Sequence, residues 1–355
     1  MAQPPRISVL LPVRNAAATL DSALGSLAEQ KFEDFEVIAV DDGSADETPA
    51  LLAAWASRDP RVRAHRVESS GNIARALIFA AARASGSLLA RFDADDLALP
   101  KRFCRQVEFL AAHPEVGLVA TGVRTLRGTL DRDGAIDAAP SDGARRYEQW
   151  LDSVVTSEEI ALNLWIESPL PHPTVMMRRE VYDQVGGYRD VGWPEDYDLW
   201  LRMLRDGVRM AKIAQPLVLW RDLPTRASRV QAVYGLDRFL DCRAHHLAQF
   251  IGVRAIVVWG AGRDGRRLAK ALLREGARID AFLDIDPRKI GRTARGRPIL
   301  DSEAWLTAAE AAADVPAPQP PLLVAAVGAA GARERIRARL IEAGFREGRD
   351  FLCAA

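Results

Sequence analysis

Segments with the length and apolar character of β-strands alternate with helical patterns over the first 120 residues, and this alternation restricts the fold. The expected strands are 7–13, 35–40, 62–67, 88–92 and 116–121, and the expected helices fall near 16–30, 46–57, 72–84 and 101–112. Strands and helices that alternate at this spacing form a largely parallel sheet with helices on both faces. Ligands bind such sheets beyond the carboxyl ends of the strands. The predicted fold class is therefore α/β, with a site at that edge.

Polar residues follow three of these strands, at the edge where a ligand would bind. The first strand runs into residues 12–15, the second into residues 41–46 and the fourth into residues 91–96. Because parallel strands end at the same edge of a sheet, these segments are expected to meet in space. Three separate strand ends thus predict one polar site.

Residues 93–96 place three carboxylates in four positions, directly after the apolar run 88–90. Carboxylates that lie so close repel one another, which favours a divalent cation between Asp93, Asp95 and Asp96. Mg²⁺ and Mn²⁺ prefer oxygen ligands and are often completed by phosphate oxygens, so a nucleoside diphosphate is the natural partner. A polar loop whose Asp residues cap the next helix explains the triplet alone equally well.

Composition limits the classes of function and the compartment. Lys plus Arg and Asp plus Glu number 48 each among 355 residues, so no overall basic field recruits nucleic acid or an anionic membrane. No apolar run approaches the ~20 residues of a membrane span. Cys104, Cys242 and Cys353 are far apart and lack metal-binding spacing, which is typical of a reducing compartment. A cytoplasmic protein, long enough for two domains, is expected.

A second acidic pair occurs later in the chain, after a less regular stretch. Residues 122–170 are expected to be a loop-rich excursion with one helix near 145–165. His172 follows in a Pro-His-Pro sequence, and Glu195 and Asp196 then fall in the first turn of a predicted helix. Acidic side chains at a helix start are favoured by the helix dipole, which is the structural explanation of this pair.

The end of the chain repeats the α/β theme in a smaller unit. Residues 230–252 are expected to form a helical linker, and residues 253–355 a Rossmann-like domain. Gly260, Gly262 and Gly265 follow a strand and open a helix, and Asp284 lies where a ribose-binding carboxylate would be expected.

The order of these motifs resembles family 2 glycosyltransferases with a GT-A fold. Residues 7–15 resemble the opening strand and loop of that family, 37–46 its V-x-D-D-G-S-x-D segment, 90–100 its R-F-D-A-D-D-x-x-x-P segment and 194–202 its E-D-Y-D-L-W-x-R helix. Four motifs in order, each at a predicted strand or helix end, form a specific signal. The resemblance implies a glycosyltransferase domain over residues 1–229.

The resemblance implies a donor site for a nucleotide-diphosphate sugar. Asp42 would contact the base, and Asp95, with Asp93 beside it, would hold Mn²⁺ or Mg²⁺ as Lewis acid and template. The residues expected to bind the donor are Pro12, Arg14, Asn15, Asp41, Asp42, Arg75, Asp93, Ala94 and Arg221. The family commonly carries a histidine where this chain has Leu223, so loop closure over the diphosphate is expected to depend on Arg221, Arg226 or Arg229.

The resemblance also implies an inverting reaction, in which Asp196 takes the proton from the acceptor hydroxyl and Glu195 orients the acceptor or its neighbours. His172 and Trp200 are further candidates for contact with the acceptor or the site. The expected acceptor is a hydroxyl of a glycan, lipid-linked or other conjugate in cell-surface polysaccharide assembly, which is compatible with peripheral contact at the inner face of the membrane. A catalytically silent sugar-nucleotide-binding or regulatory protein is the main alternative.

The smaller unit resembles the N-terminal domains of bacterial sugar O-acyltransferases, which implies nucleotide binding through Gly260, Gly262, Gly265 and Asp284. A purely structural role is the alternative. A third hypothesis is an NAD-dependent sugar oxidoreductase, but this chain lacks a Tyr-x-x-x-Lys pair after the glycines.

Overall fold

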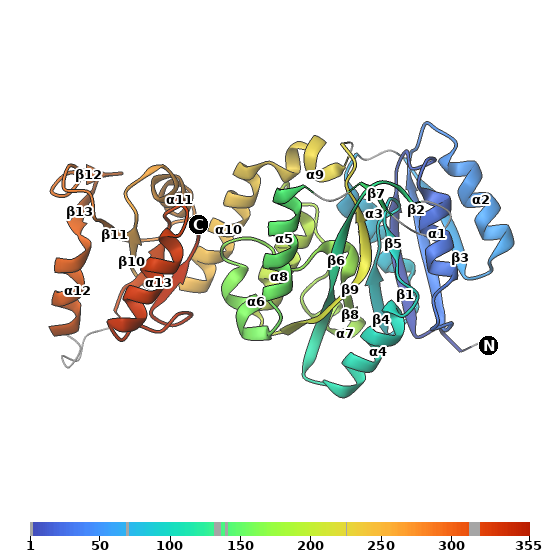
Figure 1. Ribbon diagram of the computed structural model, residues 1–355, viewed down its shortest axis with the longest axis horizontal. Coiled ribbons are helices and arrows are strands. Elements are labelled where there is room, and N and C mark those ends of the chain that lie inside the picture. Colours follow the sequence, from blue (N-terminus) through green and yellow to red (C-terminus); the bar gives the residue numbers. More distant parts are fainter. Residues whose placement is uncertain (1–2, 69–70, 131–135, 139–140, 225, 312–319) are drawn as a thin grey trace. The chain divides into compact units, whose positions relative to one another are not determined.

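The computed structural model describes residues 3–68, 71–130, 136–138, 141–224, 226–311 and 320–355. They form two compact units (Figure 1). The first unit comprises Met1–Ile160 and Pro169–Tyr234, and the second comprises Ala161–Ser168 and Gly235–Ala355. The short segment Ala161–Ser168 thus groups with the second unit, although residues of the first unit precede and follow it in the chain.

The first unit is built on a mixed sheet whose strand order is β3-β2-β1-β4-β8-β6-β9-β5, with β7 paired to β6. Its strands are β1 Ile7–Val13, β2 Phe35–Asp42, β3 Val62–Val67, β4 Leu88–Arg91, β5 Leu97–Ala98, β6 Val116–Leu130, β7 Ile136–Ala138, β8 Met176–Arg178 and β9 Arg209–Arg221. The first four strands run parallel, as the alternating pattern predicts. The α/β fold class is confirmed.

The register of the parallel strands brings their carboxyl ends to one edge. Val13 lies opposite Asp41 in the β1–β2 pair, and Leu10 lies opposite Arg91 in the β1–β4 pair. The polar segments that follow β1, β2 and β4 therefore emerge beside one another. This is the arrangement that the sequence predicts.

Helices cover both faces of the parallel half of the sheet. They are α1 Leu20–Ala28, α2 Thr48–Arg58, α3 Ile73–Arg83 and α4 Arg102–Ala112. Leu24, Leu52 and Phe103 from α1, α2 and α4 share one core cluster with the odd-numbered positions of β1. The buried residues of α3 are outside that cluster, and α3 packs against β1 and β2, so it covers the opposite face.

The stretch after residue 121 differs from the expected loop-rich excursion with one helix. The strand β6 continues to Leu130, because it pairs with β9 as far as Leu126 opposite Arg221 and its last residues pair with β7. Two helices follow, α5 Asp142–Ser153 and α6 Ser157–Asn163. The break between them is set by a capping box, in which Glu159 accepts hydrogen bonds from the backbone of Val155 and Thr156. Residues 131–135 and 139–140 lie outside the described residues.

The rest of the first unit positions the later site residues. Its helical elements are η1 His172–Thr174, α7 Arg179–Gln184, α8 Glu195–Arg205, α9 Ala227–Val230 and η2 Ala232–Tyr234. The helix α8 is almost entirely buried, with Leu199 and Met203 fully covered.

The second unit has a six-stranded sheet of order β12-β13-β11-β10-β14-β15, parallel except for β12. Its elements are α10 Leu236–Ile251, β10 Ile256–Trp259, α11 Arg263–Arg274, β11 Ile279–Asp284, β12 Thr293–Ala294, β13 Arg297–Asp301, α12 Ser302–Ala311, β14 Leu322–Ala325, α13 Ala332–Glu342 and β15 Phe351–Cys353. A separate core cluster includes Trp259, Leu283 and Phe351. The chain therefore contains a second α/β sheet domain, as the sequence predicts.

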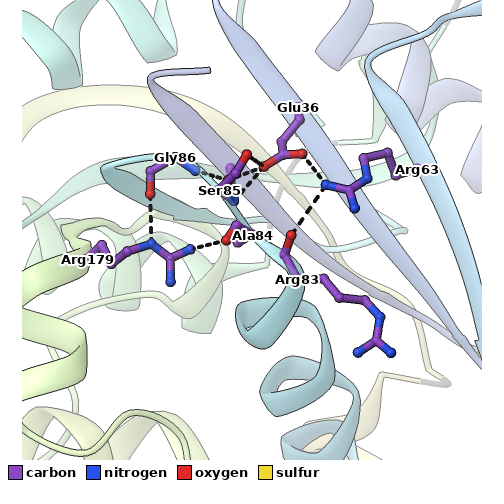
Figure 2. Close-up of polar contacts among 8 residues, drawn as sticks. Glu36, Arg63, Arg83, Ala84, Ser85, Gly86 and Arg179 are labelled. Carbon is purple, nitrogen blue, oxygen red and sulfur yellow. Dashed lines mark hydrogen bonds and ion pairs between the residues drawn. The ribbon is translucent and has the colours of Figure 1, made fainter. Parts of the chain in front are cut away.

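A buried carboxylate ties together the amino ends of the parallel strands. Glu36 Oε1 accepts hydrogen bonds from the Ser8 hydroxyl at 2.7 Å and from the Ser85 hydroxyl and amide at 2.6 and 2.8 Å. Figure 2 shows Arg63 reaching the other oxygen of Glu36, at 2.7 Å, and Arg179 donating to the Gly86 carbonyl. The network fixes the turn that precedes β4, and the acidic run follows that strand.

We expect Glu36→Ala to lower the free energy of unfolding by about 2–3 kcal/mol, because hydrogen bonds to a charged group contribute more than neutral ones. Hydrogen bonds from Ser85, Ser8 and Arg63 outweigh burial and lower the pKa of Glu36. This stabilisation is therefore present above the pKa of the unfolded carboxyl and is lost as the pH falls through the lower folded value.

Denaturant unfolding of Glu36→Ala beside Glu33→Ala, which removes an exposed side chain, measures this contribution. Equal stability of the two variants at pH 7 would show that the network does not stabilise the turn.

Candidate functional site

The carboxyl ends of β1 and β2 are joined by side chains of the segments that follow them. Asn15 takes the left-handed conformation, with φ 47°, and its amide oxygen accepts a hydrogen bond from Ala45 N at 2.9 Å. Its backbone N–H donates to the Ser44 hydroxyl at 2.9 Å. Arg14 lies 3.7 Å from the carboxylate of Asp42. The structure thus brings Arg14, Asn15 and Asp42 together at this edge.

Asp41 and Pro12 support the same edge from inside the fold. One oxygen of Asp41 accepts a hydrogen bond from Ser44 N at 2.9 Å, and the other lies 3.2 Å from Arg66. Asp41 is 1% exposed, and Pro12 is buried within β1. The carboxylate of Asp41 therefore shapes the turn after β2.

The acidic run after β4 forms a compact cluster. Asp93, Asp95 and Asp96 each offer a carboxylate oxygen within 4.8 Å of the others. Asp96 is fully buried; its Oδ1 accepts a hydrogen bond from Arg221 N at 2.9 Å, whereas its Oδ2 accepts none from the described residues. A buried carboxylate oxygen without a hydrogen-bond donor, beside two further carboxylates, fits a hard divalent cation.

The three carboxyl groups differ in their tendency to ionise. Burial, with the charge of Asp93, raises the pKa of Asp95 to about 6. Burial and the charges of both neighbours raise the pKa of Asp96 well above its usual range. Burial also disfavours the charged form of Asp93, but the charge and hydrogen bond of Arg91 reverse this effect and lower its pKa. Crowding and burial together make this cluster a place that attracts positive charge.

Arg91 is the buried cation of the site. Its side chain is 2% exposed and forms an ion pair with Asp93. Burial opposes its charge, but Asp93, Tyr188 and Glu195 together raise its pKa. Its backbone carbonyl accepts a hydrogen bond from Arg102 at 2.8 Å. The sequence motif contains Arg91 without indicating its role; its position at the end of a buried strand, two residues before Asp93, is the signal that points to it.

The start of α8 carries two acidic groups, of which Glu195 is buried and Asp196 is partly buried. Glu195 is 2% exposed, and Asp196 Oδ1 accepts a hydrogen bond from Tyr197 N at 2.7 Å. Burial raises the pKa of Asp196 to about 6, with His172 acting against it and Glu195 adding to it. A carboxylate with this pKa is suited to accept a proton near neutral pH. Helix-dipole stabilisation alone does not require Glu195 to be buried.

His172 lies beside this acidic pair. Its Nε2 is 2.7 Å from the Tyr188 hydroxyl, and its Nδ1 is 3.4 Å from Glu195 Oε1. Burial and the charge of Arg91 lower the pKa of His172 to about 3, so the ring is neutral at ordinary pH. Trp200 is fully buried and meets the His172 ring edge-on, with centroids 5.9 Å apart. Trp200 therefore packs beneath His172.

Arginines that the sequence singled out have different surroundings. Arg221 donates to the Asp95 carbonyl at 2.8 Å, so it holds the acidic loop. Arg229 pairs with Asp222. Arg226 stacks over the Trp220 ring at 3.8 Å. Its charge favours the ionised form of all three carboxyl groups of the acidic triplet, against the burial that raises the pKa values of Asp95 and Asp96. Of these three, Arg226 has its cationic group held on an aromatic face beside the carboxylates.

Arg75 at the start of α3 does not contact the acidic triplet in this structure. It forms an ion pair with Asp190 at 2.7 Å. Asp190 lies in the loop that precedes α8, so the pair links the start of α3 to the loop that carries Glu195 and Asp196. The Arg75 side chain is 63% exposed, which leaves it accessible to a ligand at the edge of the site.

The glycine-rich turn of the second unit packs tightly. Gly260 has a positive φ of 119°, and a Cβ at Gly265 would lie 1.8 Å from the Gly260 carbonyl oxygen. At Gly262 a Cβ would meet nothing within 4 Å. Asp284 accepts hydrogen bonds from Ala261 N and from Lys289, both at 3.0 Å. Asp284 therefore anchors the turn to the end of β11.

The comparisons with known proteins agree on one family. The family model described as glycosyl transferase family 2 matches residues 8–186. The putative glycosyltransferase EpsE of Bacillus subtilis is 30% identical over 237 residues, which cover 66% of this chain and 79% of that protein. The O-antigen biosynthesis glycosyltransferase WbnJ of Escherichia coli is 25% identical over 255 residues, or 70% of this chain and 91% of that protein.

A solved structure supports the fold. Residues 1–349 of S. aureus TarS, crystallised with UDP-GlcNAc, superimpose with a TM-score of 0.55 over 76% of this chain and 71% of that chain, at 17% sequence identity. Across the described residues, every helix is too short or too polar to cross a membrane.

Proposed function

Because this chain belongs to glycosyltransferase family 2 and is a glycosyltransferase, we propose that it transfers a sugar from a nucleotide-diphosphate sugar to an acceptor hydroxyl, with inversion and with the help of a divalent cation. The observation that carries this proposal is the acidic triplet after β4 together with the buried Glu195 and the partly buried Asp196 at the start of α8. Arg91 supports both, because its charge acts on Asp93 and on Asp196.

The donor half of the site would hold the nucleotide and its diphosphate. Asp42, which pairs with Arg14 at the carboxyl end of β2, would contact the nucleoside, and Asp95 and Asp93 would ligate Mn²⁺ or Mg²⁺. When bound, the cation neutralises the diphosphate leaving group. Ala94 is buried, and its carbonyl accepts a hydrogen bond from Thr19 at 2.9 Å, which fixes the backbone between the two ligands.

The acceptor half of the site would supply the base. Asp196 would remove the proton as the acceptor oxygen forms its bond to the anomeric carbon, while the bond to the diphosphate breaks on the opposite face of the sugar. The raised pKa of Asp196, about 6, makes its ionised form a stronger base than an ordinary aspartate. Glu195, adjacent and buried, would orient this end of the site.

Arg226 is our candidate for the diphosphate contact that replaces the histidine absent at Leu223. The guanidinium of Arg221 is engaged with the acidic loop and that of Arg229 with Asp222. A guanidinium matches the geometry of phosphate oxygens and remains charged at any working pH. Arg226 therefore has both the charge and the position that this role requires.

We infer a role in the assembly of a surface polysaccharide or glycoconjugate, supported by relatives named for O-antigen and amylovoran biosynthesis. The acceptor would then be a glycan or lipid-linked hydroxyl. A site at the inner face of the membrane and a cytoplasmic location stay predictions from the sequence.

Nucleotide binding by the second unit also stays a prediction. The open space at Gly262 is compatible with the approach of a phosphate, as is the start of α11 behind it. The internal hydrogen bonds of Asp284 favour a structural use of that carboxylate. The resemblance to sugar O-acyltransferase domains likewise stays a prediction from the sequence.

We expect Mn²⁺-dependent binding of one class among UDP, GDP, dTDP and CDP sugars, seen as a rise in the unfolding temperature. Asp95→Asn should abolish the Mn²⁺-dependent part of that rise, because it removes a ligand, whereas Asp196→Asn should keep it. Asp34→Asn, at an exposed carboxylate, is the matched control. No shift with any of the four donors would favour the silent binding or regulatory protein.

Asp196→Asn should reduce transfer by about 10²–10⁴-fold, the usual contribution of a positioned general base. In the unmodified enzyme, kcat should fall as the pH drops below about 6, because protonation of Asp196 removes the base. Release of the nucleoside diphosphate, measured from pH 4.5 to pH 8, gives both results. Near-normal turnover by Asp196→Asn would make the base assignment wrong.

Arg226→Ala should weaken binding of the nucleoside diphosphate and Mn²⁺ by about 10–100-fold, the range for a lost hydrogen bond to a charged group. Arg229→Ala removes a charge from the same segment and should leave this affinity near that of the unmodified protein. Titration calorimetry with the diphosphate found in the donor panel separates the two. Equal losses in both variants would contradict the assignment to Arg226.

A further inference from the structure

Tyr234 contacts the acidic pair from outside the part of the chain that the family model matches. It is the last residue of η2 and of the first unit, whereas the match ends at residue 186. The Tyr234 hydroxyl lies 2.8 Å from Glu195 Oε2 and 3.0 Å from Oε1. A phenol carries a single proton, so the hydroxyl donates to the two oxygens of an ionised Glu195 in a shared hydrogen bond.

His172 lies on a second side of Glu195. The pKa of His172 is lowered to about 3 by burial, so the ring is neutral and carries one N–H. With that proton on Nδ1, Nε2 accepts a hydrogen bond from the Tyr188 hydroxyl at 2.7 Å, and Nδ1 lies 3.4 Å from Glu195 Oε1. Tyr234 therefore donates its hydrogen bond to a buried carboxylate that has the neutral His172 ring on another side.

We propose that Tyr234 is a positioning residue of the glycosyl-transfer site, which keeps Glu195 ionised and in place beside Asp196 through its hydroxyl. This inference rests on the proposed function, because it gives Tyr234 a part in the transfer that Asp196 performs. Tyr234 itself would touch neither the donor nor the acceptor.

The surroundings of Glu195 explain why a donor is needed there. Burial raises the pKa of Glu195, while the Tyr234 hydrogen bond and the charge of Arg91 lower it. The titratable and charged groups that act on Glu195 or contact it are Arg91, Asp93, His172, Tyr188, Asp196 and Tyr234. Among these, the negative charges of Asp93 and Asp196 disfavour the ionised form of Glu195. Loss of the Tyr234 hydroxyl leaves a buried carboxylate with one strong donor fewer.

An ionised Glu195 in turn affects its neighbour Asp196. The two residues are the first two of α8, and the charge of Glu195 raises the pKa of Asp196. A neutral Glu195 would leave Asp196 a weaker base. Tyr234 is thereby linked to proton removal through one intermediate residue.

The test compares Tyr234→Phe, which keeps the ring and removes the hydroxyl, with Tyr147→Phe, the same change in α5. The assay uses the full chain, Mn²⁺ and the sugar nucleotide identified by thermal shift. In Tyr234→Phe, kcat for release of the nucleoside diphosphate should fall about 10-fold. The KM for the donor should not change. A merely structural loss would alter the unfolding temperature and KM as well.

A double-mutant cycle shows whether Tyr234 acts through Glu195. Glu195→Gln should lower kcat and shift its acidic limb to lower pH, because the charge that raises the pKa of Asp196 is gone. Tyr234→Phe added to Glu195→Gln should then cost little more. Additive losses would overturn the proposal, as would unchanged kcat in Tyr234→Phe while Asp196→Asn is inactive.

A measurement that does not require turnover tests this inference separately from the proposed function. In protein labelled with ¹³C at the glutamate carboxyl carbon, the Glu195 signal is identified by its loss in Glu195→Gln. Its titration midpoint should move to higher pH in Tyr234→Phe and stay in place in Tyr147→Phe. An unmoved midpoint overturns the role of Tyr234, whereas failure of the unmodified protein to use any sugar nucleotide would count against the proposed function alone.

Discussion

The buried guanidinium of Arg91 is the interaction on which the site depends. It lies at the end of β4, next to Asp93, and its charge also acts on Glu195, Asp196 and His172. Acidic groups from two distant parts of the chain can be buried near each other only if positive charge accompanies them. Arg91 supplies that charge from within the fold. A divalent cation in the donor half would add an exchangeable positive charge to this fixed one.

The same charge separates the carboxylates into different roles. Asp93 touches Arg91 and has a lowered pKa, whereas Asp95 lies further along the loop and has a pKa raised to about 6. Asp196 reaches a similar value through burial, but with a neutral imidazole and a second carboxylate as its neighbours. Under the proposed function, carboxyl groups of one chemical type would serve as ligand and as base because their surroundings differ.

Sequence patterns predict the parts of this site that follow from strand geometry. Because parallel strands end at one edge, the strand pattern alone places Asn15, Asp42 and Asp95 near one another. Contacts that depend on side chains from elements far apart in the chain are beyond such reasoning. The hydrogen bond from Arg221 to the Asp95 carbonyl depends on the long pairing of β6 with β9. The hydrogen bond from Tyr234 to Glu195 depends on the path that the chain takes after β9. A local sequence pattern determines neither the register of strand pairing nor the path of the chain.

Asp95 and Asp284 show why an acidic residue after a buried strand does not by itself define a ligand site. Asp284 receives hydrogen bonds from Ala261 and Asp286 and an ion pair from Lys289, and its pKa is lowered. The acidic triplet has fewer such donors: Asp96 keeps one buried oxygen unpaired within the described chain, and the pKa of Asp95 is raised. A carboxylate whose hydrogen bonds are complete stabilises the fold, whereas a buried one with incomplete hydrogen bonds favours an added cation. The distinction lies in the donors that tertiary structure supplies, and it favours the first unit as the place where this chain binds its charged substrate.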